Sequence, residues 1–314
     1  MRSRRTGLEE VPRRPFGRHE DQVSILGIGG YHLGKTRTIK EAVRVLHAAI
    51  DSGINFLDNA WEYHEGESEE RMGRAIEDRR AAVFLMTKVC THGRDATVAM
   101  RQLEQSLRRL RTDYLDLWQV HECVYHNDPE RHFARGGVMQ ALERAKRDGK
   151  VRYIGFTGHK DPEIHLRMLS FEFPFDACQL PLNGFDAGFR SFQRRVLPEL
   201  ARQQIAAIGM KSLGGDGRAI KKKATTIDEA LRYAMSLQVC TTVSGIDSMR
   251  VLRQNLEIVR GFAPMNASER TAYERRLGED AADGRFELYK TTAEHEGDVG
   301  RKQHGFPSQE EMAS

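Results

Sequence analysis

The sequence predicts an α/β fold, a (β/α)8 TIM barrel in which parallel strands alternate with helices. Short apolar runs recur along the 314 residues, and amphipathic segments separate them, most clearly at 38–53. Runs that are apolar on both faces are typical of parallel strands covered by helices. Repeats of roughly 30 residues match a closed barrel of about 250 residues.

The predicted strands lie one strand–helix unit apart, at 23–29, 54–57, 82–87, 114–120, 151–156, 176–182, 205–210 and 239–245. An open doubly wound sheet is the alternative, and such sheets place G-x-G-x-x-G at their first turn. The nearest match, "GIGGYHLG", is followed by more loop before the first helix. The barrel is therefore favoured.

Two segments lie outside the repeat. Residues 1–12 are predicted to form an Arg-rich flexible arm. Residues 13–260 are predicted to form a single barrel, and their first part, 13–24, is expected to form an N-terminal hairpin that closes the bottom of the barrel. Residues 261–314 become strongly polar, so we expect a helix from about Ala267 and then a flexible tail.

Composition narrows the class of protein. The net charge is +4, with much of the excess in the N-terminal arm, so nucleic-acid binding is not expected. Arg4-Arg5 precede no apolar run of the kind export signals need, and no run approaches the roughly 20 residues of a membrane span. Scattered cysteines predict reduced thiols in a cytoplasmic protein, and the histidines lack metal-ligand spacing, so we expect no metal.

Polar residues that follow the predicted strands are the candidate active-site groups, because barrel enzymes place their sites at this rim. Asp58, Lys88 and His121 end three consecutive strands, and Tyr63 lies in the loop after Asp58. Singly, each has an ordinary structural role, such as a cap, an ion-pair partner or a core histidine. Together they suit proton transfer to a carbonyl oxygen, with the ammonium lowering the pKa of the phenol and a neutral histidine donating to the oxygen. A hydride donor is the missing partner.

The stretch "FLDNAWEYHEGESEERMGRAI" resembles the Asp-x-Ala-x-x-Tyr signature of the aldo-keto reductase family. The resemblance runs over about 13–260 and implies a catalytic tetrad. Tyr63 would be the general acid, Lys88 and Asp58 would tune it, and His121 would position the substrate carbonyl.

The resemblance also implies a nicotinamide cofactor, with NADP(H) favoured and NAD(H) possible. The implied cofactor-binding residues are Gly29, Gly30, Tyr31, Asp58, Thr157, Gly158, Gln179, Met210, Lys211, Leu213, Gly214, Gly245, Arg250, Arg253, Gln254 and Asn255. Three positions depart from the family pattern. Gly158 replaces an amide residue, Met210 replaces a stacked tyrosine, and Gly245 replaces a basic residue whose place Arg250 or Arg253 could take.

The implied activity is reduction of an aldehyde or ketone by hydride transfer from NADPH. Residues expected to edge the substrate pocket are Tyr31, Trp61, His121, Glu122 and Tyr125, whereas Glu62 is expected in a solvated loop. A cofactor-binding regulatory subunit is the alternative, because the family includes potassium-channel subunits. A metal-dependent hydrolase needs several strand-end histidines, and only His121 qualifies. No cysteine follows Cys240, which excludes the iron–sulfur branch. The partner is a small carbonyl compound; the sequence predicts neither its identity nor the oligomeric state.

Overall fold

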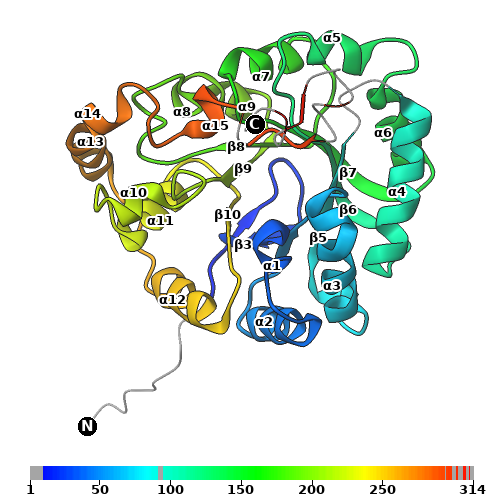
Figure 1. Ribbon diagram of the computed structural model, residues 1–314, viewed down its shortest axis with the longest axis horizontal. Coiled ribbons are helices and arrows are strands. Elements are labelled where there is room, and N and C mark those ends of the chain that lie inside the picture. The colour runs from blue at the N-terminus through cyan, green and yellow to red at the C-terminus, as the bar shows by residue number, and fades with distance from the viewer. Residues whose placement is uncertain are drawn as a thin grey trace.

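The computed structural model describes residues 10–90, 95–293, 295–298, 302, 307–308 and 311. At its centre lies a closed barrel of parallel strands, with helices around the outside (Figure 1). Neighbouring strands follow the order β10-β3-β4-β5-β6-β7-β8-β9, and β9 pairs with β10 to close the ring. The predicted (β/α)8 fold is confirmed.

Each barrel strand coincides with one of the predicted apolar runs. The strands are β3 (Leu26–Gly29), β4 (Phe56–Asp58), β5 (Phe84–Val89), β6 (Leu115–Val120), β7 (Val151–Thr157), β8 (Ala177–Pro181), β9 (Ala206–Met210) and β10 (Thr241–Ser244). The first predicted strand, 23–29, is split at Ile25. Its beginning belongs to a separate hairpin, and only its end enters the barrel.

Most of the longer helices outside the barrel bury an apolar face, whereas α13 buries only Tyr273. The longer ones are α2 (Ile39–Asp51), α3 (Glu67–Ile76), α4 (Ala96–Leu110), α6 (Val138–Arg147), α7 (Pro162–Leu169), α11 (Ile227–Ser236), α12 (Met249–Arg260) and α13 (Ala267–Arg276). Shorter ones are α1 (Gly30–Leu33), α5 (Asp128–Phe133), α8 (Phe192–Arg195), α9 (Leu197–Arg202), α10 (Arg218–Lys221), α14 (Gly278–Ala281) and α15 (Leu288–Thr291). The 3-10 turns are η1 (Tyr63–Gly66) and η2 (Arg80–Ala82).

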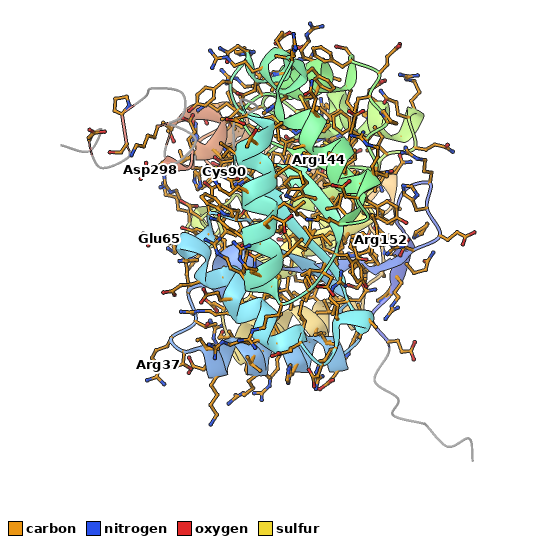
Figure 2. All side chains as sticks on the ribbon, turned by 90° about the vertical axis from the view of Figure 1, so that its right-hand side faces the viewer. Arg37, Glu65, Cys90, Arg144, Arg152 and Asp298 are labelled. Atoms are coloured by element: carbon orange, nitrogen blue, oxygen red, sulfur yellow. The ribbon has the colours of Figure 1, made fainter. Side chains whose placement is uncertain are left out.

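The predicted N-terminal hairpin is present as β1 (Arg13–Pro15) paired antiparallel with β2 (Gln22–Ser24). Phe16 lies at its turn, fully buried, with its ring centroid 4.7 Å from that of Phe84 at the start of β5. The hairpin therefore closes the end of the barrel where the strands begin. Figure 2 shows Arg152, near the start of β7, on the side opposite Glu65 and Asp298.

Both ends of the described chain are packed more tightly than predicted. Residues 1–9 of the expected arm lie outside the described residues, but Val11 is buried against Gly53. The predicted helix is found as α13, beginning at Ala267. The expectation of a flexible tail after it does not fit Tyr289 and Lys290, which are fully buried. The charge of Lys290 is buried together with those of Asp186 and Glu287, which explains why this segment is packed.

None of the helices in the described part of the chain combines the length and apolar character that crossing a membrane requires. All four cysteines are buried thiols: Cys178 lies in β8, Cys90 follows β5, Cys240 precedes β10, and Cys123 lies in the loop after β6.

Candidate active site

Three neighbouring strands bring the predicted acid, amine and imidazole to one rim. Asp58 is the last residue of β4, Lys88 lies next to the end of β5, and His121 directly follows β6. The ammonium of Lys88 is buried and contacts Asp58 Oδ1. It also donates to the carbonyl oxygen of Asn59 at 2.8 Å. Lys88 and Asp58 thus form a buried ion pair in the structure.

Tyr63 reaches this pair from the loop after β4. Its ring centroid lies 5.2 Å from Lys88 Nζ and 5.6 Å from the ring centroid of His121, at an interplanar angle of 79°. The η1 turn positions it, and within that turn His64 and Glu65 adopt left-handed backbone angles, with φ of 52° and 56°. The four predicted side chains therefore gather at one point.

The electrostatic setting of Tyr63 differs from the prediction. Burial, followed by the charges of Asp58 and Glu62, raises the pKa of Tyr63 well above its ordinary value. Because Asp58 matches the charge of Lys88 directly, the ammonium does not lower the pKa as expected. The site therefore holds Tyr63 as a protonated phenol.

Gln179, in β8, donates from Nε2 to Asp58 Oδ2 at 2.9 Å. Its amide oxygen is buried and has no hydrogen-bond partner among the described residues. Buried polar atoms are normally satisfied, so this oxygen is available to a ligand donor. Thr157 ends β7 and is buried, whereas Gly158 is closely packed, because a Cβ there would lie 2.3 Å from the carbonyl oxygen of Cys123.

Gly29 and Gly30 are closely packed within the protein itself. A Cβ on Gly30 would lie 2.6 Å from Asn59 Cγ, and one on Gly29 would lie 3.2 Å from Val243 Cγ1. The protein's own side chains therefore already occupy the space beside these glycines. Tyr31, next in sequence, is 46% exposed, and its ring centroid lies 5.5 Å from that of Tyr63.

Met210 ends β9, and the loop that follows brings Lys211 to the rim, with Leu213 and Gly214 further along it. Burial lowers the pKa of Lys211 to about 8. Its ammonium lies 5.0 Å from the ring centroid of Tyr289. A Cβ on Gly214 would lie 2.7 Å from the carbonyl oxygen of Phe286, so this loop packs against the C-terminal segment.

The predicted adenosine-phosphate segment forms the start and middle of α12. Arg250 and Arg253 are exposed, Gln254 is half-buried, and Asn255 is buried, donating to Ser244 Oγ at 2.7 Å. Gly245 faces His32, since a Cβ at Gly245 would lie 2.4 Å from His32 Nδ1.

Of the predicted pocket-edge residues, Glu122 and Tyr125 lie beside His121 and near the C-terminal segment. Glu122 is buried, and Tyr125 donates from its hydroxyl to Glu296 Oε2 at 2.8 Å. Trp61 points elsewhere, because its indole nitrogen donates to Gln105 Oε1 on α4 at 2.7 Å and its ring lies beneath Arg109.

With this geometry established, comparison with known proteins settles the family. A model of the aldo/keto reductase family matches residues 25–229, the greater part of the barrel. The chain belongs to the aldo/keto reductase family. It is 32% identical to the uncharacterized oxidoreductase YrpG of Bacillus subtilis (strain 168), over 67% of this chain and 70% of YrpG.

It is 28% identical to methylglyoxal reductase YeaE of Escherichia coli (strain K12), over 62% of this chain and 65% of YeaE. The matched parts of two further Bacillus subtilis relatives are shorter, at 48% of YqkF and 59% of YhdN. The barrel superposes on aldo-keto reductase AKR11C1 from Bacillus halodurans with a TM-score of 0.71 and 22% identity, covering 85% of this chain and 96% of that one. A Klebsiella pneumoniae aldo/keto reductase in complex with NADP and acetate superposes with a TM-score of 0.65 at 23% identity. The match covers 82% of this chain and 93% of that one. At these identities the structural likeness establishes the fold.

Within this member of the aldo/keto reductase family, Glu62 was missed as a site residue. Its side chain is 11% exposed rather than solvated, and its Oε1 lies 2.6 Å from His121 Nδ1. A Glu immediately before the tyrosine was visible in the sequence, but no periodicity predicts that a loop side chain turns inward.

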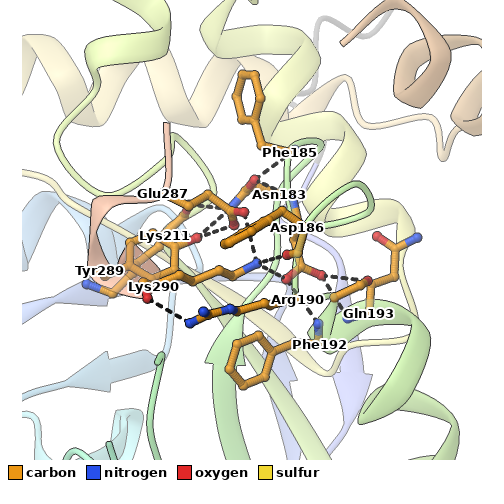
Figure 3. A network of polar contacts seen from close by, with 12 residues as sticks. Asn183, Phe185, Asp186, Arg190, Phe192, Gln193, Lys211, Glu287, Tyr289 and Lys290 are labelled. Atoms are coloured by element: carbon orange, nitrogen blue, oxygen red, sulfur yellow. Dashed lines mark hydrogen bonds and ion pairs between the residues drawn. The ribbon is translucent and has the colours of Figure 1, made fainter. Parts of the chain in front are cut away.

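The C-terminal anchor was also missed (Figure 3). We use this name for Lys290, Glu287 and Asp186, which are fully buried. Lys290 Nζ donates to Asp186 Oδ1 at 2.7 Å and to Glu287 Oε2 at 2.9 Å. Asn183 extends the network from the loop after β8 to the carbonyl oxygen of Lys211 at 3.3 Å. The anchor thus joins the C-terminal segment to the rim loops after β8 and β9.

Glu62, His121 and Glu122 place three potential metal-ligand atoms within 4.8 Å of one another. His121 Nδ1 and Glu62 Oε1, however, are 2.6 Å apart. Two ligands around a tetrahedral zinc ion, each at about 2.1 Å, would be roughly 3.4 Å apart. The short contact is therefore that of an ion pair rather than of two ligands of one ion.

Proposed function

We propose that this chain reduces an aldehyde or ketone to an alcohol by hydride transfer from NADPH, with Tyr63 as the general acid. The single observation that carries the proposal is the placement of Tyr63 between the Lys88–Asp58 pair and His121. Named substrates of relatives, such as methylglyoxal for YeaE, fit a small carbonyl compound.

The residues fit a nicotinamide cofactor by one test that uses only this structure. Gln179 presents a buried amide oxygen without a partner among the described residues, which suits a carboxamide N–H donor. Asp58, Thr157 and Gln179 would hold the nicotinamide end. The phosphates would be held by Lys211 and by the backbone of Leu213 and Gly214. The adenosine would be held by α12. When bound, the cofactor supplies the hydride.

The chain's own groups then handle the proton and the oxygen. His121 orients the carbonyl oxygen by hydrogen bonding, and Tyr63 holds its proton until negative charge develops on that oxygen. The phenolic proton passes to the oxygen, and Lys88 stabilises the tyrosinate that is left. Asp58 keeps Lys88 in place as its ion-pair partner.

Exposed arginines on α12 support the choice of NADPH over NADH. Arg250 and Arg253 are both exposed at the first turns of this helix, where a guanidinium could pair with a phosphate. Replacing both with Ala is expected to raise the KM for NADPH and to leave the KM for NADH unchanged. Equal effects on both cofactors would remove the support for NADPH.

The decisive experiment follows oxidation of NADPH and of NADH by the purified protein with an activated aromatic aldehyde. Tyr63→Phe is expected to lower turnover by about 10²–10⁴-fold, as for loss of a general acid, while cofactor binding stays intact. Normal turnover in this variant would refute the assignment of Tyr63. Bound cofactor with no turnover in the wild type would favour the regulatory-subunit alternative.

A further inference from the structure

Glu62 lies directly behind the imidazole that the proposed function uses. Its Oε1 lies 2.6 Å from His121 Nδ1, which is the distance of an ion pair. The angle is not that of a hydrogen bond, since the buried Nδ1 has no hydrogen-bond partner among the described residues. Its other oxygen, Oε2, accepts from the thiol of Cys90 at 3.0 Å, just after β5. Partners from two different strand ends therefore hold the carboxylate, and it in turn fixes the ring of His121.

The contact has a chemical consequence for His121. A bare imidazole nitrogen and a carboxylate oxygen 2.6 Å apart would repel each other, so the Nδ1 atom that faces Glu62 carries a proton. A neutral imidazole has one N–H, which leaves the opposite nitrogen, Nε2, as an acceptor. His121 can donate from Nε2 to a carbonyl oxygen only as an imidazolium, with both nitrogens protonated.

Other titratable groups also face His121 from every described element around it. Tyr63 lies on one side and Glu122 follows His121 in its own loop. His159, in the loop after β7, interacts with the charge of His121. Lys211, in the loop after β9, acts on the neighbouring Glu122, and Cys90 lies behind Glu62. The C-terminal segment adds the backbone N–H of Gly297, which donates to Glu122 Oε2 at 2.9 Å.

Glu62 and Glu122 differ in how they are held. Burial and the charge of Glu62 raise the pKa of Glu122 to about 7. Glu122 is therefore largely protonated below neutral pH, and Glu62 is the carboxylate in direct contact with the imidazole. One ring and one carboxylate thus form a pair, much as Lys88 and Asp58 do on the next strands.

We propose that Glu62 is a positioning residue for the reduction: it holds His121 by Nδ1 and is the counter-ion of its imidazolium, so that Nε2–H donates to the substrate oxygen. This inference rests on the proposed function, because it assigns a role within that same reaction. It also changes the predicted role of His121 from a neutral donor to a charged one.

The test compares Glu62→Gln, Glu62→Asp and the control Glu67→Gln. Glu67 lies at the start of α3, and its side chain is 63% exposed. For each variant, kcat/KM for aldehyde reduction is measured across pH, together with cofactor affinity and thermal melting. Histidine 15N NMR reports the protonation of each ring nitrogen of His121.

Glu62→Gln is expected to move the fall in kcat/KM with rising pH to lower pH by about one unit or more, which is a loss of about tenfold at a fixed neutral pH. Cofactor affinity stays unchanged, and the 15N signals of His121 lose protonation at lower pH than in the wild type. Glu62→Asp keeps the charge, so it is expected to restore part of the shift. Glu67→Gln behaves as wild type.

An unchanged pH profile in Glu62→Gln, with unchanged 15N signals, overturns the proposal. So does a loss of kcat/KM that is uniform across pH and equal in Glu62→Asp, because that indicates only a structural role. If Glu62→Gln does not fold, Glu62→Asp and the 15N titration of the wild type decide: Nδ1 of His121 bare near neutral pH overturns the proposal. The 15N arm needs no turnover, so its outcome is separate from failure of the proposed reductase activity.

Discussion

Lys290→Met removes the only cation of the C-terminal anchor while keeping a side chain of similar length. In the structure Lys290 donates to Asp186 at 2.7 Å, to Glu287 at 2.9 Å and to the carbonyl oxygen of Phe189 at 2.7 Å, with no exposed side-chain surface on any of the three charged groups. Burial already raises the pKa of both carboxyl groups. Without the ammonium, two buried carboxylates would face each other.

Loss of one partner of a buried ion pair costs about 3–5 kcal/mol, because the remaining charge is uncompensated. Lys290→Met is therefore expected to lower the free energy of unfolding by about this amount. Urea titration followed by tryptophan fluorescence measures it, with an unchanged m-value indicating an unchanged folded state. Protonation of Asp186 and Glu287 relieves the repulsion, so the loss should shrink as the pH falls.

Lys146→Met is the matched control for this experiment. Lys146 pairs with buried Asp176 at 2.7 Å, but its own side chain is 42% exposed, and Arg18 also contacts that carboxylate. The expected loss is below about 1 kcal/mol, as for an exposed pair. A loss of the same small size for Lys290→Met would refute the reasoning about the anchor.

Two further predictions concern titration of rim residues. The pKa of Lys211 is about 8, so if its charge binds cofactor phosphate, affinity should weaken above that pH. In Lys211→Met, the affinity for NADPH should be lower and should no longer change with pH around 8, whereas Lys221→Met, at an exposed position, should resemble wild type. Fluorescence titration with NADPH measures both variants. A wild-type pH profile in Lys211→Met would contradict the role of Lys211 in binding phosphate. The pKa of Glu122 is raised from 4.5 to about 7. The folded state therefore holds this proton more tightly than the unfolded chain, so stability is lost as pH rises through that window, by up to about 3 kcal/mol. In urea titrations at several pH values, the free energy of unfolding of Glu122→Gln should not fall over this pH window. An equal fall in the wild type and in Glu122→Gln would contradict the prediction.

Sequence reasoning was strongest where one short range of residues determines the structure. The apolar runs predicted all the barrel strands, because parallel strands buried on both faces need continuous apolar sequence. The rim residues followed from the strand ends, and the structure brings Asp58, Tyr63, Lys88 and His121 together as predicted. Boundaries were less accurate at Ile25, where a strand of the hairpin passes directly into the barrel without a turn signal.

Sequence reasoning failed where burial depends on partners distant in the chain. The segment around Lys290 reads as polar and exposed, because a buried charge is costly unless a matching charge meets it. That match comes from Asp186, 104 positions earlier, which no local pattern indicates. The sign of the shift in the pKa of Tyr63 was also wrong, because burial raises this pKa and the charges of Asp58 and Glu62 raise it further.

The loop after β4 explains how one short stretch supplies two different functions to the rim. Glu62 and Tyr63 are consecutive, yet one contacts His121 Nδ1 and the other lies edge-on to the same ring. The left-handed angles of His64 and Glu65, and φ of 97° at Gly66, turn the chain sharply into α3 directly behind them. A Cβ on Gly66 would lie 2.2 Å from Arg109 Cζ, so the turn packs closely against a side chain of α4. The proposed acid and the proposed partner of His121 are therefore positioned by the same turn, and a change that shifts one is expected to shift the other.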